Sequence, residues 1–344
     1  MDISQTTQRI YDEATVVDGL NVSNWDSDSV FESLHSGQVA AINATLVTWE
    51  NFRETLDHIT GWIGRFHERA DVITQVGNVE DIHRAKREGK VGIILGWQNT
   101  SPIENDLDRL ELFHRLGVRV MQVTYHERNL LGDGCMERQD GGLTNFGVDA
   151  VREMNRLGIL LDLSHVGIAT TMDAIEISEK PVAITHANAK SYYDHRRNKT
   201  DDAIKLMAEK GGVIGSTCIR TFLRNSTQAT MEDYLDAIDH LVEMVGVDHV
   251  GVGTDHTQDQ TSDFWKYIGA QQGTKFPSSF TAVSGEPQPW QDHYPDDLET
   301  PDQLPNLAEG LLNRGYNGDD IIKILGGNWI RLFGEVWSNS LDSK

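Results

Sequence analysis

The sequence predicts one α/β domain in which eight β/α units close into a (β/α)8 TIM-type barrel. Short apolar runs alternate with amphipathic helical segments, and polar side chains follow most of the runs. No internal repeat and no domain-length linker divides the chain. Barrels of this kind commonly take about 250 residues and grow by insertion. We therefore expect residues 1–344 to form a single domain.

In the first half of the chain, apolar residues recur at the helical period between the apolar runs. In Asn51–His67, for example, Phe52, Leu56 and Ile59 would share one face. The predicted strands are Ala14–Asp18, Val39–Trp49, Val91–Gly96 and Val118–Thr124. The predicted helices are Asn51–His67, Val79–Arg87 and Glu104–Leu116.

The second half repeats the alternation. Tyr234, Ile238 and Leu241 mark the buried face of a long helix. The predicted strands are Ile159–Leu163, Pro181–Thr185, Gly212–Ser216 and His249–Thr254. The predicted helices are Phe146–Leu157, Ala169–Glu179, Asp201–Lys210, Met231–Val245, Leu304–Leu312, Asp319–Leu325 and Trp329–Val336.

Two of these strands deliver a histidine at their carboxyl ends. Ile159–Leu163 is followed by Ser164-His165, and Pro181–Thr185 is followed by His186. A helical segment between them makes a β-α-β unit, which places both imidazoles on the same rim. Two converging neutral imidazoles are typical ligands of a divalent transition metal. The alternative is a pair of histidines that are only hydrogen-bonded within the core.

Composition limits the classes of function. Acidic residues outnumber basic ones 53 to 30, for a net charge of −23, which argues against nucleic acid or an anionic membrane as partner. Two cysteines, Cys135 and Cys218, indicate no disulfide framework and a reducing compartment. The first residues show no signal peptide, and no apolar run approaches the roughly 18 residues of a membrane span. We expect a cytoplasmic protein.

A polar segment, about residues 258–301, is too long to be a simple connection. Clustered aromatic side chains predict that it forms either a lid over the barrel mouth or a homodimer interface. These are Trp265, Phe276, Phe280 and Trp290.

Four sequence motifs resemble those of the membrane (renal-type) dipeptidases. They are REMNRLGILLDLSHVG (152–167), PVAITHANA (181–189), DHRRN (194–198) and HVGVGTDHT (249–257). The resemblance covers most of the chain, and it implies a (β/α)8 barrel with two zinc ions bridged by a glutamate. It implies that His165 and His186 bind one zinc, and that Asp255 binds the other zinc and handles the proton of the attacking water. Arg197 would hold the substrate carboxylate.

Three positions depart from the family pattern. Leu20 and Val22 occupy the places of a His-x-Asp ligand pair after the first strand. Gln98 replaces the bridging glutamate, and Tyr125 replaces a histidine, with His126 one position later. The resemblance therefore implies that one of the two zinc sites has lost most of its ligands.

The remaining set predicts one zinc ion per chain, bound by His165, His186 and Asp255 with an open position for water. Asp255 could equally act as the general base. Gln98 could bind the metal weakly or hydrogen-bond the substrate. Tyr125 and His126 could stabilise a developing oxyanion. A purely structural polar role is the alternative for these last three.

For Arg197, the alternative is a solvated surface with salt bridges. The leading hypothesis is a metal-dependent hydrolase that cleaves an amide-like bond in a small carboxylate-bearing or dipeptide-like substrate. A single-metal lyase acting by elimination and a catalytically inactive binding barrel are the competing hypotheses. Metal content and product identity distinguish the three.

Overall fold

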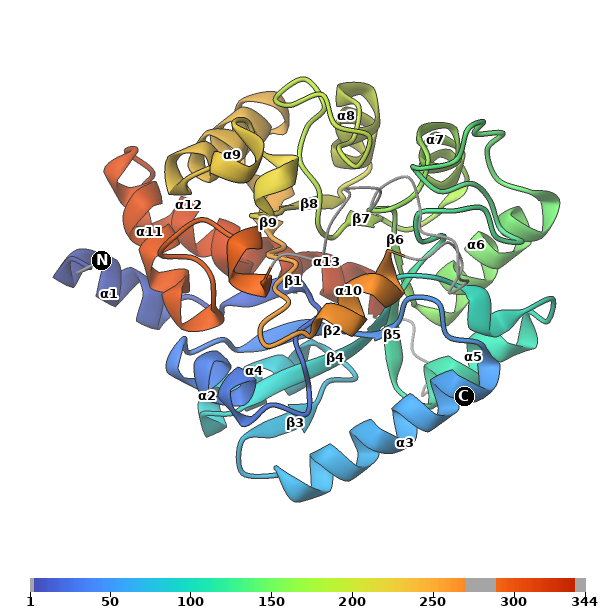
Figure 1. Ribbon diagram of the computed structural model, residues 1–344, viewed down its shortest axis with the longest axis horizontal. Coiled ribbons are helices and arrows are strands. Elements are labelled where there is room, and N and C mark those ends of the chain that lie inside the picture. The colour runs from blue at the N-terminus through green and yellow to red at the C-terminus, as the bar shows by residue number, and fades with distance from the viewer. Residues whose placement is uncertain (1–2, 270–288, 338–344) are drawn as a thin grey trace.

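The computed structural model describes residues 3–269 and 289–337, and within them eight parallel strands form a nearly closed barrel (Figure 1). Backbone hydrogen bonds from Asp255 to Leu20 (3.1 Å) and from Val22 to His256 (2.7 Å) join the last strand to the first. The predicted fold class is confirmed. Around the barrel the strands are β1 (Val17–Asn21), β2 (Ala41–Val47), β4 (Val91–Trp97), β5 (Val118–Gln122), β6 (Leu160–Asp162), β7 (Ala183–Ile184), β8 (Val213–Ser216) and β9 (Val250–Val252).

Helices surround the barrel, and their ends carry recognisable caps. Asn51 and Glu54 form a capping box at the start of α3, and Gly158 ends α6 with a φ of +74° that favours glycine. None of the helices in the described ranges combines the length and apolar composition needed to cross a membrane. The helices are α1 (Gln5–Glu13), α2 (Asp28–Ser36), α3 (Phe52–Glu68), α4 (Val79–Glu88), α5 (Asp108–Arg115), α6 (Asn145–Leu157), α7 (Ile168–Ile177), α8 (Asp201–Glu209), α9 (Met231–Val245), α10 (Ser262–Ile268), α11 (Leu304–Asn313), α12 (Gly318–Ile322) and α13 (Asn328–Trp337).

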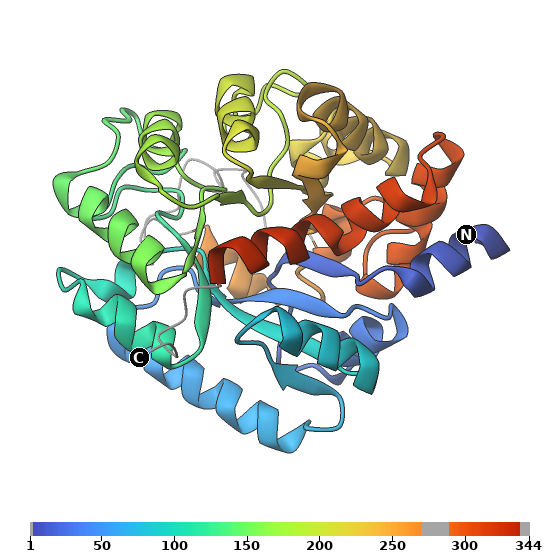
Figure 2. The same ribbon diagram turned by 180° about the vertical axis from the view of Figure 1, so that it is seen from behind.

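The last helix, α13, crosses one end of the barrel (Figure 2). Trp329 of this helix is fully buried and donates its indole N–H to the carbonyl of Val252 (2.9 Å). A Cβ at Gly19 would lie 2.6 Å from the Trp329 ring, and one at Gly251 would lie 2.6 Å from its nitrogen. Glycine in these strands therefore makes room for the indole. Because α13 covers this end, the candidate site lies at the opposite end, where the strands finish.

The predicted order of strands and helices is confirmed, but some boundaries differ. β1 extends to Asn21, although the sequence predicted that the strand would end at Asp18. A charged residue is tolerated inside this strand because Thr254 of the neighbouring strand end donates two hydrogen bonds to Asp18. The sequence did not predict β3 (Ile73–Gln75), which pairs with β4 off the barrel path, or α2.

Only the two flanks of the segment 258–301 are described. The first contains α10, which lies over the ends of β1 and β2 in Figure 1. Trp265 stacks on His293 of the second flank, with ring centroids 4.2 Å apart, and Trp290 begins a short 3-10 helix there. Phe276 and Phe280, which the lid prediction also invoked, lie outside the described residues. The lid or dimer role stays a prediction.

Candidate functional site

His165 and His186 meet at the ends of β6 and β7. Their Nε2 atoms are 2.9 Å apart, and both side chains are buried. The short β6-α7-β7 unit explains this, because parallel neighbouring strands end at the same rim. The structure therefore brings together the two histidines that the strand-end pattern singled out.

A chain of hydrogen bonds fixes the tautomer of His186. Asp162 accepts from the Oγ1 of Thr185 (2.7 Å), and that hydroxyl contacts the Nδ1 of His186 (2.7 Å). Since the hydroxyl has one proton and gives it to the carboxylate, it must accept from His186 Nδ1–H. The Nε2 of His186 consequently keeps its lone pair and accepts from the Nε2–H of His165.

Asp162 is the centre of this arrangement, and the sequence had shown it only as a polar break in an apolar strand. Its Oδ1 accepts from the backbone N–H of Ser164 (3.0 Å), the Ser164 hydroxyl (2.6 Å) and the backbone N–H of Thr185 (2.9 Å). A fully buried carboxylate with four donors is rigidly held. In the sequence, the only indication of this role was a charged residue, Asp162, within the apolar strand Ile159–Leu163, which was expected to be buried.

Asp18 of β1 repeats this arrangement with the end of β9. It accepts from the backbone N–H (2.8 Å) and Oγ1 (2.6 Å) of Thr254, just as Asp162 accepts from Thr185. In each case the threonine directly precedes a candidate site residue, His186 or Asp255. The hydrogen bonds of Asp162 with Thr185 and of Asp18 with Thr254 thus fix the backbone next to His186 and Asp255. Asp255 needs such support because its φ is +61°, a conformation that non-glycine residues rarely adopt.

Burial sets the protonation of the site. It lowers the pKa of His165 and of His186 well below the ordinary value, and the nearby Arg197 cation lowers both further. Both rings are neutral at pH 7. Burial also raises the pKa of Asp255 to about 7, although Arg197 opposes the shift. Asp255 can therefore exchange a proton near neutral pH.

Tyr125 and His126 follow β5 and lie against the imidazole pair. The Tyr125 ring stacks on His165 with centroids 4.1 Å apart, and the His126 ring is 4.6 Å from that of His165. Burial raises the pKa of Tyr125, so its hydroxyl stays protonated and able to donate. Burial lowers the pKa of His126 well below the ordinary value, so this ring is neutral as well.

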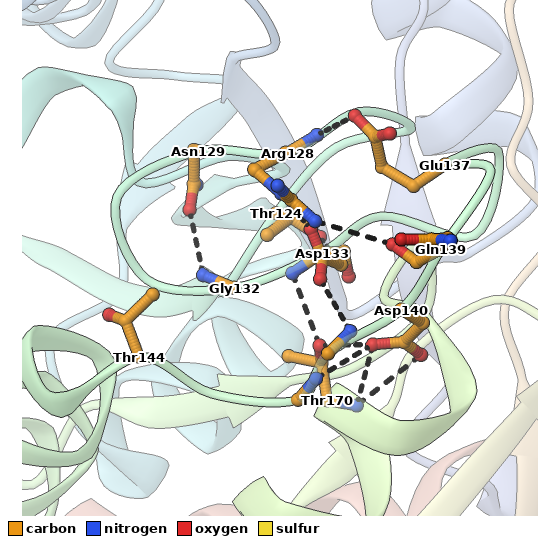
Figure 3. Close-up of polar contacts among 12 residues, drawn as sticks. Thr124, Arg128, Asn129, Gly132, Asp133, Glu137, Gln139, Asp140, Thr144 and Thr170 are labelled. Atoms are coloured by element: carbon orange, nitrogen blue, oxygen red, sulfur yellow. Dashed lines mark hydrogen bonds and ion pairs between the residues drawn. The ribbon is translucent and has the colours of Figure 1, made fainter.

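Polar contacts anchor the glycine-rich loop after β5 to the start of α7 (Figure 3). Asp140 accepts from the backbone N–H of Ala169 (2.6 Å) and the hydroxyl of Thr170 (2.8 Å), which anchors the loop to the start of α7. Thr170 in turn receives a hydrogen bond from the backbone N–H of Asp133 (3.1 Å). The backbone N–H of Cys135 then donates to the carbonyl of His165 (2.8 Å). Loop, α7 and β6 thus form one connected unit.

Arg197 is fully buried, which excludes the solvated surface that was its alternative interpretation. Its two terminal nitrogens donate to the carbonyls of Ser164 and His186, both at 2.7 Å. The guanidinium thereby ties the ends of β6 and β7 together. Its Nε–H has no acceptor among the described residues.

Gln98 directly follows β4 and is buried. Its Nε2 donates to the hydroxyl of Thr45 (3.0 Å), while its Oε1 has no hydrogen-bond partner within residues 3–269 and 289–337. Leu20 and Val22 are buried apolar side chains at the end of β1. The end of β1 therefore carries apolar side chains at the two positions where the family pattern has metal ligands.

The imidazole pair fits a shared metal ion, but a complete shell is not assembled. Two nitrogens bound to one tetrahedral zinc lie roughly 3.4 Å apart, given a Zn–N bond of about 2.1 Å. The Nε2 atoms of His165 and His186, 2.9 Å apart, would therefore separate slightly to hold one ion. In the described ranges, however, no three His, Cys, Asp or Glu side chains form a group that could hold a metal ion. Asp255 therefore does not complete the predicted three-ligand set in this arrangement.

Cys135 and Cys218 are both free thiols.

Comparison with known proteins gives consistent matches. Residues 7–268 match the model of the membrane dipeptidase family, peptidase family M19. A curated relative, the dipeptidase aclJ of Aspergillus oryzae, is 27% identical over 296 residues, which cover 84% of this chain. The aligned region spans only 63% of the length of that relative.

Solved structures resemble the whole barrel. A protein described as an amidohydrolase from Pseudomonas aeruginosa is 36% identical, with a TM-score of 0.91, covering 96% of this chain and 99% of its own. A metallopeptidase from Rhodobacter sphaeroides, whose structure holds a phosphinate mimic of the dipeptide L-Ala-D-Ala, is 21% identical. Its TM-score is 0.77, covering 94% of this chain and 99% of its own, and at this identity the likeness shows the fold alone.

Proposed function

Because this chain belongs to the membrane dipeptidase family, we propose that it is a metal-dependent hydrolase that cleaves an amide or peptide-like bond in a small carboxylate-bearing substrate. The observation that carries the proposal is the pair His165 and His186. Their Nε2 atoms are 2.9 Å apart at the mouth of the barrel, and a buried carboxylate fixes the tautomer of one of them.

His165 and His186 would hold one divalent ion, which we propose to be zinc. Bound there, the ion would supply Lewis acidity and lower the pKa of a water molecule. For His165 to offer its Nε2 lone pair, its proton must move to Nδ1, which has no partner among the described residues. The His186 tautomer needs no change.

Asp255 would act as the general base. With a pKa near 7, its carboxylate accepts a proton from water at neutral pH and can return it to the leaving amine. Tyr125 keeps its phenolic proton and would donate to the oxygen on which negative charge develops. His126, a neutral ring beside it, is the second candidate donor.

Arg197 would attract the substrate carboxylate. Its guanidinium donates to the backbone carbonyls of Ser164 and His186, and Nε–H is the donor left without an acceptor in the described part of the chain. Gln98, with an unpartnered Oε1, would accept from an N–H of the substrate. The substrate would therefore lie across the ends of β4 to β7.

The test is hydrolysis of a panel of dipeptides, N-acyl amino acids and other small carboxylates by the zinc-loaded protein. We expect hydrolysis of at least one compound, with loss of activity in His165→Ala and in His186→Ala. Asp57→Asn, on the exposed surface of α3, serves as the control and should leave the rate unchanged. Elimination products would indicate a lyase, and an inactive protein with bound metal would contradict the hydrolase proposal.

A further inference from the structure

The second flank of the segment 258–301 packs against the strand end that carries Asp255. Tyr294 follows the short 3-10 helix Trp290–His293 and is fully buried, as is Leu298. The hydroxyl of Tyr294 donates to the backbone carbonyl of Asp255 (2.7 Å), which lies 39 positions earlier in the chain. This flank therefore reaches the residue that we propose as the general base.

Further contacts join the same two parts of the chain. The Nε2–H of His256 donates to the carbonyl of Leu298 (3.0 Å), and the His256 ring packs edge-on against the Tyr294 ring, with centroids 5.0 Å apart. Arg220, which lies after β8, forms an ion pair with Asp296 (2.7 Å). These contacts fix the ring of Tyr294 independently of the hydrogen bond that its hydroxyl makes to the strand end.

The second partner of the Tyr294 hydroxyl shows in which direction the hydrogen bonds run. The hydroxyl also contacts Oγ1 of Thr257 (2.7 Å). A carbonyl can only accept, so the single phenolic proton goes to Asp255 and the Thr257 hydroxyl donates to Tyr294. Burial raises the pKa of Tyr294, and the nearby Asp255 carboxylate raises it further, so the phenol keeps this proton.

The backbone of Asp255 depends on such support because its φ is +61°. A non-glycine residue keeps this conformation only where the surrounding structure fixes it. The N–H of Asp255 donates to the carbonyl of Leu20 (3.1 Å), so the bond from Tyr294 completes a pair that holds both backbone polar groups of Asp255. Loss of one bond of this pair lets the backbone relax, and the place of the carboxylate depends on that backbone.

We propose that Tyr294 is a positioning residue, which holds the strained backbone of Asp255 and thereby fixes where its carboxylate lies. The assignment rests on the proposed function in one respect, namely that Asp255 acts as the base. It gives the second flank of the segment 258–301 a role that the aromatic pattern of the sequence did not predict. A displacement of about 1 Å at a reacting group can cost about 100-fold in rate.

The first test measures amide hydrogen exchange, which needs no substrate. Tyr294→Phe removes only the hydroxyl, and its ring can keep the packing against His256. We expect the amides of Asp255 and His256 to exchange about 10-fold faster, as for the loss of one hydrogen bond, while the amides of β5 keep their rates. Tyr11→Phe is the matched control, because Tyr11 is also buried and donates to a backbone carbonyl, that of Gly37, at 2.7 Å.

The kinetic test compares the same two variants on the compound that the wild type hydrolyses best. We expect kcat of Tyr294→Phe to fall about 10- to 100-fold, with KM changed less than about twofold, because a displaced base slows the chemical step and not binding. Tyr11→Phe should keep the kcat of the wild type. Thr257→Val removes the donor to Tyr294 and should lower kcat by a smaller factor, whereas Thr257→Ser, which retains the hydroxyl, should behave like the wild type.

For Tyr294→Phe, exchange rates at Asp255 and a kcat that both match Tyr11→Phe would overturn the positioning role and leave the hydrolase intact. Faster exchange without a fall in kcat would overturn it too, and so would a higher KM at unchanged kcat. If the wild type hydrolyses no compound, the proposed function fails and the exchange test decides alone. Locally faster exchange then supports the hold of Tyr294 on Asp255, and unchanged exchange refutes it.

Discussion

Asp162→Asn tests how the chain orients its imidazole pair. The carboxylate accepts four hydrogen bonds, three at Oδ1 and one at Oδ2. An asparagine can satisfy the three donors at Oδ1 with its carbonyl oxygen. Its NH₂ group then faces the hydroxyl of Thr185, which must accept where it formerly donated.

This reversal reaches His186 directly. Once the Thr185 hydroxyl accepts from the introduced amide, its proton is free to be donated to Nδ1 of His186, 2.7 Å away. The ring proton then moves to Nε2, and the lone pair that faces His165 is lost. Removing a partner of this kind typically lowers metal affinity about 10- to 100-fold, and the lost charge-assisted bond costs about 1.5–3 kcal/mol of stability.

The assay is 15N NMR of histidine-labelled protein, which reports the tautomer, together with zinc titration at pH 7. Asp18→Asn is the matched control, because it removes an equivalent buried carboxylate from Thr254 without touching His186. Both variants should lose stability, and Asp162→Asn alone should change the His186 tautomer. A folded Asp162→Asn protein with the wild-type tautomer and zinc affinity would refute the reasoning.

Four further predictions concern Asp255, Arg197 and Trp329. If Asp255 is the base, kcat/KM should rise with pH through about 7, where its carboxyl ionises, and a profile that is flat from pH 6 to 8 would contradict the role. Burial raises the pKa of Asp255, so its protonated form contributes to the free energy of unfolding fully below about pH 4, and this contribution is lost as pH rises through 7. Asp255→Asn should therefore make the free energy of unfolding less dependent on pH between about 4 and 7. Arg197→Met should raise KM for a carboxylate substrate. It should also lower the unfolding temperature, because two hydrogen bonds to backbone carbonyls are lost. An unchanged KM in the folded variant would show that Arg197 does not bind the substrate. Trp329→Ala should lower the free energy of unfolding, measured by denaturant titration, by about 3–5 kcal/mol, because it leaves a cavity in the barrel interior. The His186 tautomer should not change. A near-zero change in the free energy of unfolding would contradict the packing described for this residue.

The alternation of apolar strands and amphipathic helices predicted the barrel, because each strand or helix can be identified from the residues within it. The apolar strands and the His that follows each of β6 and β7 can be identified within about ten residues of sequence. The short β3 carried too few residues to stand out, and its pairing with β4 depends on tertiary contacts.

The partners of the site residues were not predictable in the same way. The hydroxyl of Thr185 and the carboxylate of Asp162 are 23 positions apart, and Asp18 and Thr254 are 236 apart, so only the folded chain brings them together. Arg197 was predicted as a substrate ligand from a motif. Its bonds to the carbonyls of Ser164 and His186 could not be inferred without knowing that β6 and β7 end side by side.

The proposed function requires that His165 and His186 form the metal centre of a hydrolase. Elemental analysis of protein saturated with zinc and then dialysed tests it most directly. We predict close to one zinc per chain in the wild type and far less in His186→Ala, with the first-strand side too apolar, at Leu20 and Val22, to hold a second ion. No retained zinc would contradict the claim and favour a binding barrel, and two equivalents would contradict the single site.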